Sequence, residues 1–131
     1  MTPYIEEAQR LLRLAKRDYD TFAILRAHPE AKLAPTCFHA QQSVEKALKA
    51  VLTAGRVYFR HTHDLEELFK LLVDAGFAPP CASSDLRRLT PFAVELRYDE
   101  HVTPLLTREE AARIASETLE WAQQKVVTIS E

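Results

Sequence analysis

Apolar residues recur at intervals of three and four along most of the chain, the spacing that places them on one face of an α-helix. The first such stripe follows Thr2 and Pro3, which together suit a helix start, and it ends before Pro29. Four further stripes follow. The pattern predicts helices over residues 4–27, 35–54, 64–75, 83–99 and 108–128.

Residues that begin and end helices support these bounds. Pro35 suits the first turn of the second helix, and the segments Asp64–Glu67 and Thr107–Glu110 both resemble capping boxes. The two glycines of the chain, Gly55 and Gly76, each come directly after a helical stripe, where a C′ cap is expected. The sequence therefore predicts where the helices begin and end as well as which faces are apolar.

The fourth stripe contains a break. Pro91 lies inside residues 83–99 and is expected to kink the helix or to split it, with Thr90 as a second N-cap. Ser83 or Ser84 is the expected cap at its start. No internal repeat and no long linker divides the chain. Residues 1–131 are therefore predicted to form one all-α domain, an up-and-down bundle of four long helices and a shorter third one.

Composition narrows the classes of function. Only 2 glycines occur in 131 residues, and neither of the glycine-rich phosphate-binding motifs GxGxxG and GxxxxGK[ST] is present. The 17 Lys and Arg residues against 19 Asp and Glu give a net charge of −2, which excludes a protein coated with positive charge for DNA binding. A local basic patch remains compatible with this balance.

The cysteines and the apolar runs indicate a compartment. Cys37 and Cys81 are not spaced as metal ligands, so neither a disulfide framework nor a zinc site is expected. No secretory signal and no apolar run long enough to span a membrane is recognisable. A cytoplasmic protein without a metal or another cofactor is predicted.

Two segments carry a resemblance to a known family. The segment FHAQQSVEKALKAVL at residues 38–52 is followed by THDLEEL at residues 62–68 and later by Arg97-Tyr98. Together they resemble the HEPN family, small helical bundles named for nucleotide binding in higher eukaryotes and prokaryotes. The resemblance implies a bundle that dimerises and pairs with a minimal nucleotidyltransferase, as in toxin–antitoxin systems. Some members are metal-independent ribonucleases, whereas others bind only nucleotide or a partner.

The ribonuclease members carry an arginine and, four to six residues later, a histidine. In this chain Arg97 and His101 are separated by only three residues, which departs from that pattern. A spacing of four positions still places both on one face of a helix, where His101 can act as general base and Arg97 can stabilise a phosphorane-like transition state. The alternatives are phosphate binding without cleavage, or an arginine near a helix end beside a solvated loop histidine.

Polar residues on the second predicted helix are a further candidate site. They share one face because they lie three or four positions apart, and they are His39, Gln42, Lys46 and Lys49. Such a face can read a base through the amide and meet phosphate through the lysines. Alternatively, it is an ordinary solvated face on which Glu45 and Lys49, four positions apart, form a pair. Gln41 instead falls within the apolar stripe, so it must either join two helices or face a partner protein.

The loop before the third predicted helix mixes basic and aromatic side chains. Tyr58 and Phe59 stand among the basic residues Arg56, Arg60, His61 and His63. This mixture can bind single-stranded nucleic acid by charge and stacking, or the aromatic rings can simply cover the end of the bundle. His61, His63 and Asp64 are too few for a metal site, and Asp64 is better explained as a helix cap.

Three functions follow from the sequence. The first is a nucleotide- or RNA-binding module that pairs with a nucleotidyltransferase, with Arg97, Lys46, Lys49, Gln42 and His39 as binding residues. The second is a metal-independent ribonuclease with Arg97 and His101 as catalytic residues. The third is a purely structural bundle. A homodimer or a dimer of dimers is expected, because small bundles with wide apolar faces often bury one face against a second copy.

Overall fold

The structure is a computed structural model that describes residues 2–93 and 106–131. Its helices are α1 (Pro3–Arg26), α2 (Leu33–Ala54), α3 (Leu65–Asp74), α4 (Ser83–Leu89), the 3₁₀ helix η1 (Thr90–Ala93) and α5 (Arg108–Ser130). No β-strand occurs in these described ranges. The all-α prediction is confirmed.

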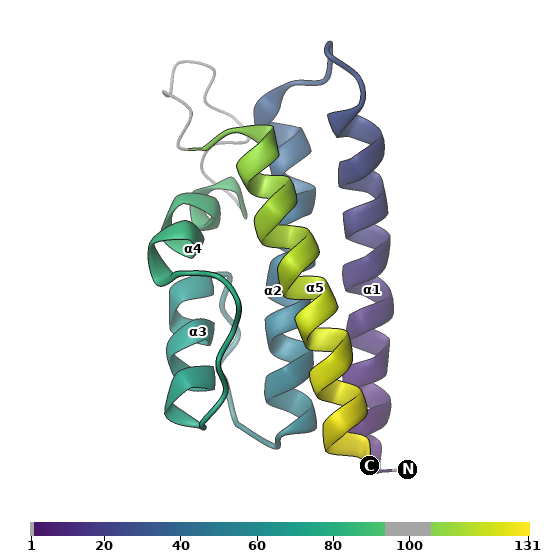
Figure 1. The fold of residues 1–131 in the computed structure, drawn as a ribbon, viewed down its shortest axis with the longest axis vertical. Helices are drawn as coiled ribbons and strands as arrows, with labels where there is room; N and C mark the ends of the chain where they lie inside the picture. Colours follow the sequence, from purple (N-terminus) through teal and green to yellow (C-terminus); the bar gives the residue numbers. More distant parts are fainter. Residues whose placement is uncertain (1, 94–105) are drawn as a thin grey trace.

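The three long helices α1, α2 and α5 lie side by side, and α3 and α4 stand beside them on the side away from α1 (Figure 1). α2 is the central element, because it packs against α1, α5, α3 and η1. Both termini lie at the same end of the bundle, so α1 and α5 run in opposite directions (Figure 1). The short connection over residues 27–32 makes α1 and α2 antiparallel neighbours.

The caps of α1 and α5 form as the sequence predicts. The hydroxyl of Thr2 accepts a hydrogen bond of 3.2 Å from the backbone N–H of Ile5, at the start of α1. Thr107 and Glu110 form a complete capping box, in which each side chain accepts from the other residue's backbone N–H. Each cap satisfies donors that the first turn of a helix leaves unpaired.

The start of α2 and its C-terminal cap differ from the prediction, whereas the helix ends at Ala54 as expected. The helix begins at Leu33, two residues before Pro35, and its N-cap Lys32 makes no side-chain hydrogen bond, so the sequence carried no capping signal there. At the other end Gly55 has a φ of −81°, and Arg56 adopts the left-handed conformation with a φ of 57°. A Cβ at position 55 would lie 3.3 Å from the Phe77 ring, so a larger residue there requires that ring to shift slightly.

The expected capping box of α3 is only half formed. The carboxylate of Asp64 accepts from the backbone N–H groups of Glu66 and Glu67, at 3.0 Å and 3.3 Å. The side chain of Glu67 does not reach back, because it binds the guanidinium of Arg60 at 2.7 Å. Gly76 follows the C-cap of α3 with a φ of 93°, which confirms its predicted role as a helix end.

The fourth predicted helix is short in the described part of the chain. α4 ends at Leu89, and the segment up to Ala93 forms a single 3₁₀ turn around Pro91. Ser83 does not cap α4, because its hydroxyl binds Glu66 at 3.0 Å. Thr90 begins η1, but its hydroxyl does not cap that helix, since it accepts from the backbone N–H of Leu65 and donates to the Leu86 carbonyl. Residues 94–99 of the predicted helix lie outside the described residues.

Small buried residues allow α1 and α2 to approach closely. Ala8 and Ala15 of α1 and Ala40 and Ala47 of α2 are all fully buried. The buried hydroxyl of Ser43 donates a hydrogen bond of 2.8 Å to the Ala15 carbonyl, which joins the two helices directly. This close packing holds the polar side chains of α2 against α1.

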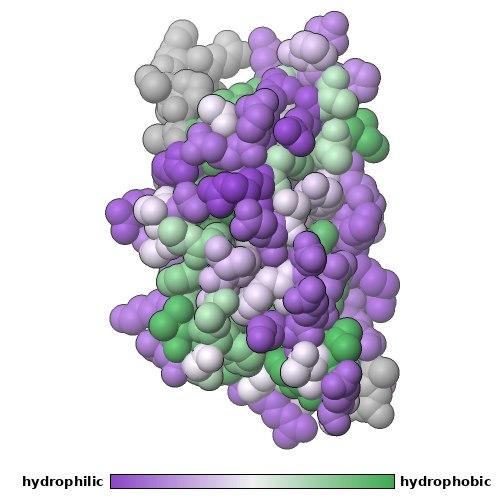
Figure 2. All heavy atoms as spheres, in the orientation of Figure 1, coloured by the Kyte–Doolittle hydropathy of each residue, from purple (hydrophilic) through white to green (hydrophobic). Residues whose placement is uncertain are grey.

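The surface is mainly polar, as the face in Figure 2 shows. The large apolar side chains that remain exposed are Tyr4, Ile24, Tyr58, Val73 and Val127. None of the helices in the described residues is long and apolar enough to cross a membrane.

Candidate functional site

The four polar residues of α2 share one face, as their spacing predicts. We call His39, Gln42, Lys46 and Lys49 the polar face of α2. All four are half-buried rather than fully solvated, because α1 lies along one side of them and the loop before α3 lies along the other. The face is therefore a strip of polar side chains between α1 and the loop before α3.

Asp18 of α1 lies on one side of this strip, next to Lys46 and His39. Its carboxylate is 16% exposed and pairs with the ammonium of Lys46, whose side chain is 23% exposed. The same carboxylate lies 3.7 Å from Nδ1 of His39, which is beyond hydrogen-bond distance. Nδ1 of His39 is buried and makes no hydrogen bond. His39 thus presents an unused polar atom beside an ion pair.

Glu45 is the centre of a second cluster. Its carboxylate is buried and lies 2.7 Å from Nδ1 of His63 and 3.0 Å from Nζ of Lys49. The amide of Gln41 also donates to it, at 3.3 Å. A buried charge is stable only when it is paired and hydrogen-bonded, and Glu45 meets both conditions. The pair with Lys49, four positions along the helix, confirms the spacing seen in the sequence.

Gln41 joins α2 to the loop before α3. Its side chain is fully buried, and its amide donates to the His63 carbonyl at 3.2 Å as well as to Glu45. Its own oxygen accepts from the amide of Gln42 at 2.7 Å. The structural interpretation of Gln41 is confirmed, although it connects a helix to a loop rather than two helices.

The basic residues of the loop are mostly engaged with neighbours. Arg60 forms a bidentate contact with Glu67, and the guanidinium of Arg56 stacks over the Tyr4 ring at 4.8 Å. Phe59 lies beneath the ammonium of Lys49, with 5.8 Å between Nζ and the ring centroid. Tyr58 projects outward, with 84% of its surface exposed.

Two candidate residues fall elsewhere. Arg97 and His101 lie outside the described residues, so their relation to the polar face of α2 is not part of the described structure. Within the described ranges, no group of three or more His, Cys, Asp and Glu side chains is arranged to hold a metal ion.

The cysteines are buried thiols. Burial raises the pKa of Cys37 to about 12, although the nearby Arg108 guanidinium opposes the shift. Burial likewise raises the pKa of Cys81. A nucleophilic cysteine requires the thiolate at neutral pH, so neither thiol is suited to catalysis.

Comparison with known proteins gives the family. The model of the HEPN domain matches residues 8–125, which is most of the chain. The chain belongs to the HEPN domain family. Both segments that carried the resemblance, residues 38–52 and 62–68, lie within the match, and they are the segments that meet at Glu45 and His63.

A solved structure supports the HEPN fold. The crystal structure of an archaeal HEPN homologue matches with a TM-score of 0.63 and 18% sequence identity, and the match covers 92% of this chain and 98% of that one. At this identity the likeness concerns the fold alone. A search of curated proteins gives no match.

Sequence reasoning missed two carboxylates of this HEPN site. Asp18 lies on α1, 28 positions before its partner Lys46, so no local spacing pointed to it. Glu45 was recognised only as the partner of Lys49, whereas His63 approaches it from 18 positions away. The four-residue steps between Gln41, Glu45 and Lys49 were the available signal, since they place three polar side chains in one row of a helix.

Proposed function

We propose that this HEPN protein is a nucleotide- or RNA-binding module that pairs with a minimal nucleotidyltransferase, in the manner of a toxin–antitoxin pair. Family membership supports a nucleotide- or RNA-related helical module. The observation that carries the proposal further is the polar face of α2, where an amide, an imidazole and two ammonium groups lie in one strip. Amides suit base edges and ammonium groups suit phosphate.

The ion pairs of the strip determine how strongly it binds. Lys46 is already held by Asp18, and Lys49 is held by Glu45. A phosphate must compete with these carboxylates, so binding is expected to be weak and sensitive to salt. Arg97 is the proposed additional phosphate ligand, because its planar guanidinium suits that group.

A pair of variants on opposite sides of one ion pair tests the role of the strip. Asp18→Asn frees Lys46, so the affinity for a fluorescent single-stranded RNA is expected to rise several-fold. Lys46→Ala is expected to lower it. Lys70→Ala on α3 is the matched control, because Lys70 is exposed and lies outside the strip. If Asp18→Asn leaves the affinity unchanged while the fold is intact, the strip does not bind phosphate.

Cleavage is the alternative to simple binding. Arg97 and His101 stand four positions apart in the sequence, and an RNA cleavage assay in EDTA tests them directly. Cleavage that disappears in both Arg97→Ala and His101→Ala supports a metal-independent ribonuclease. Binding without cleavage supports the module, and the absence of both supports a structural bundle.

The proposed partners are tested by assembly. We propose a homodimer or a dimer of dimers in the cytoplasm, and a complex with a nucleotidyltransferase encoded nearby. Light scattering at micromolar concentration is expected to give a mass of at least two chains. Co-expression with the neighbouring nucleotidyltransferase is expected to give a stable complex, and separate elution of the two proteins would contradict the pairing.

A further inference from the structure

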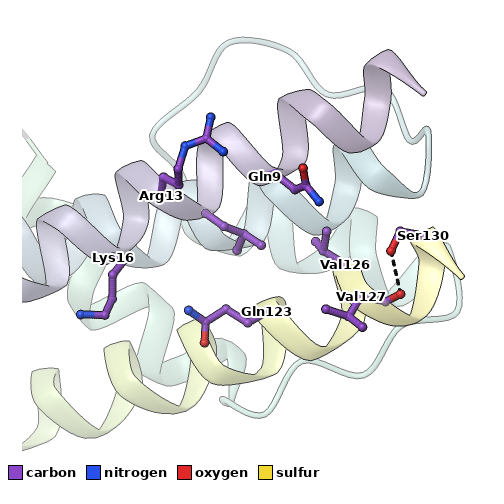
Figure 3. Close-up of a pocket in the computed structure, with 8 residues that line it drawn as sticks. Gln9, Arg13, Lys16, Gln123, Val126, Val127 and Ser130 are labelled. Atoms are coloured by element: carbon purple, nitrogen blue, oxygen red, sulfur yellow. Dashed lines mark hydrogen bonds between the residues drawn. The ribbon is translucent and has the colours of Figure 1, made fainter. Parts of the chain in front are cut away.

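A groove runs along the bundle between α1 and α5. None of its lining residues belongs to the polar face of α2, and α1 reaches that face only through Asp18. The groove has a volume of about 520 Å³. Gln9 of α1 and Gln123, Val126 and Val127 of α5 face each other across it, and Lys16 extends beside it (Figure 3). Leu12, Arg13 and Ser130 complete its lining.

The lining combines an apolar floor with a basic rim. Val127 is 57% exposed, Leu12 is half-buried and Val126 is 2% exposed, so Val127 and Leu12 supply the accessible aliphatic surface. Arg13 and Lys16 supply positive charge, and no carboxylate belongs to the lining. The chain as a whole carries a net charge of −2, so this positive, acid-free groove departs from the character of the molecule.

The cations of the groove are available to a ligand. Arg13 is exposed and has no ion-pair partner among the described residues. Lys16 contacts Asp20 at 2.5 Å, but both side chains are 54% exposed. Such solvated pairs contribute little free energy and exchange readily. A carboxylate from a partner can therefore meet both cations.

The dimensions suit about two turns of a helix. The lining positions extend from Gln9 to Lys16 on one wall and from Gln123 to Ser130 on the other, which corresponds to about 10 Å at 1.5 Å per residue. Most of the polar lining residues are exposed, so the groove is open and would leave a small molecule largely in water. Its lining contains no aromatic ring on which the bases of a single strand could stack.

We propose that this groove docks an amphipathic helix of a partner protein. Apolar side chains of that helix pack on Leu12, Val126 and Val127, and its carboxylates meet Arg13 and Lys16. Helix-in-groove recognition uses apolar anchors three and four positions apart, which match the aliphatic floor. Charge complementarity then selects an acidic helix over a basic one. The inference goes beyond the proposed nucleotide or RNA binding and does not depend on it.

The test uses two synthetic helical peptides of equal length. Both carry leucines three and four positions apart, and one has glutamates on the flanks where the other has lysines. Fluorescence anisotropy is expected to show binding of the acidic peptide only, with affinity that falls as salt rises. Arg13→Glu and Val127→Asp are each expected to weaken it about tenfold or more, because each places a negative charge against the acidic helix.

Matched controls separate the groove from general surface effects. Arg26→Glu makes the same charge reversal at an exposed residue of α1, and Ile24→Asp makes the same apolar-to-acidic change at a side chain that is 63% exposed. Neither residue lines the groove, so binding is expected to remain within about twofold. Arg13→Gln repeats the test with a milder change if the reversal disturbs the fold.

Several results would overturn the proposal. These are failure of the acidic peptide to bind, equal binding of the basic peptide, or equal losses in the control variants. Displacement of the peptide by single-stranded RNA, with Arg13→Glu weakening the RNA instead, would make the groove a nucleic-acid surface. Absence of RNA binding by the parent protein, while the acidic peptide still binds, would refute only the proposed function.

Discussion

Glu45 is the buried carboxylate on which the contacts between α2 and the loop before α3 converge, and its removal is expected to destabilise the bundle strongly. Glu45→Ala leaves the ammonium of Lys49, 12% exposed, without its carboxylate. It also removes the acceptor for Nδ1 of His63. The amide of Gln41 keeps its bond to the His63 carbonyl, so the loop loses only part of its attachment.

The magnitude follows from what each group loses. Removing one partner of a buried ion pair costs about 3–5 kcal/mol when the other charge stays buried. Lys49 and especially His63, with 47% of its side chain exposed, can turn toward water. We therefore expect a loss near the lower end, about 3 kcal/mol of unfolding free energy, or a decrease in Tm on the order of 10 °C for a domain of this size.

Urea and thermal unfolding followed by far-UV circular dichroism measure this loss. Glu67→Ala is the matched control, because it removes a glutamate from the exposed pair with Arg60 and is expected to cost less than about 1 kcal/mol. Replacing Glu45 and Lys49 together with methionine is expected to restore most of the stability, since no buried charge is left alone. A Glu45→Ala variant as stable as Glu67→Ala would refute the reasoning.

Three further outcomes are expected. Partial burial opposes ionisation of Asp85, but hydrogen bonds from Arg88 and Arg113 outweigh it and lower the pKa of that carboxyl; a lowered pKa stabilises the fold above the unfolded-state value of about 4. Urea titrations should therefore show Asp85→Asn less stable than the parent near neutral pH, with the difference shrinking as pH falls below that value. The buried Cys37 thiol, whose pKa is raised to about 12, should react with a thiol reagent only as the chain unfolds. Labelling of Cys37 in the folded protein at the rate of an exposed thiol would contradict its burial. Gly76→Val should cost about 1–2 kcal/mol in thermal melts through the backbone alone, because φ is 93° and a Cβ there meets nothing within 4 Å.

Local signals in the sequence predicted the helices well. Thr107 with Glu110, Thr2 before Pro3, and Gly76 all act where their spacing placed them. Local rules failed where a distant residue competed for the same group. The hydroxyl of Ser83 binds Glu66 instead of capping α4, and the Glu67 carboxylate binds Arg60 instead of completing a capping box.

The candidate site was predicted only in part for the same reason. The helical period placed His39, Gln42, Lys46 and Lys49 on one face, and they do lie there. Their burial and their ion pairs depend on how α1 and the loop before α3 pack against α2, which no periodicity along one helix describes. A sequence therefore shows which side chains share a face more readily than which charges neutralise them.

Titration of labelled single-stranded RNA into the parent protein and Arg97→Ala, repeated over a range of salt concentrations, tests the proposed function most directly. We expect Arg97→Ala to bind more weakly and to reduce the slope of log K against log salt by about 0.7, the value for one lost phosphate contact. The thermal melt should stay nearly unchanged. Unchanged affinity and slope in a folded Arg97→Ala variant would contradict a phosphate-binding role for this arginine. So would an Arg97→Ala variant that unfolds or loses its dimer without a change in RNA affinity.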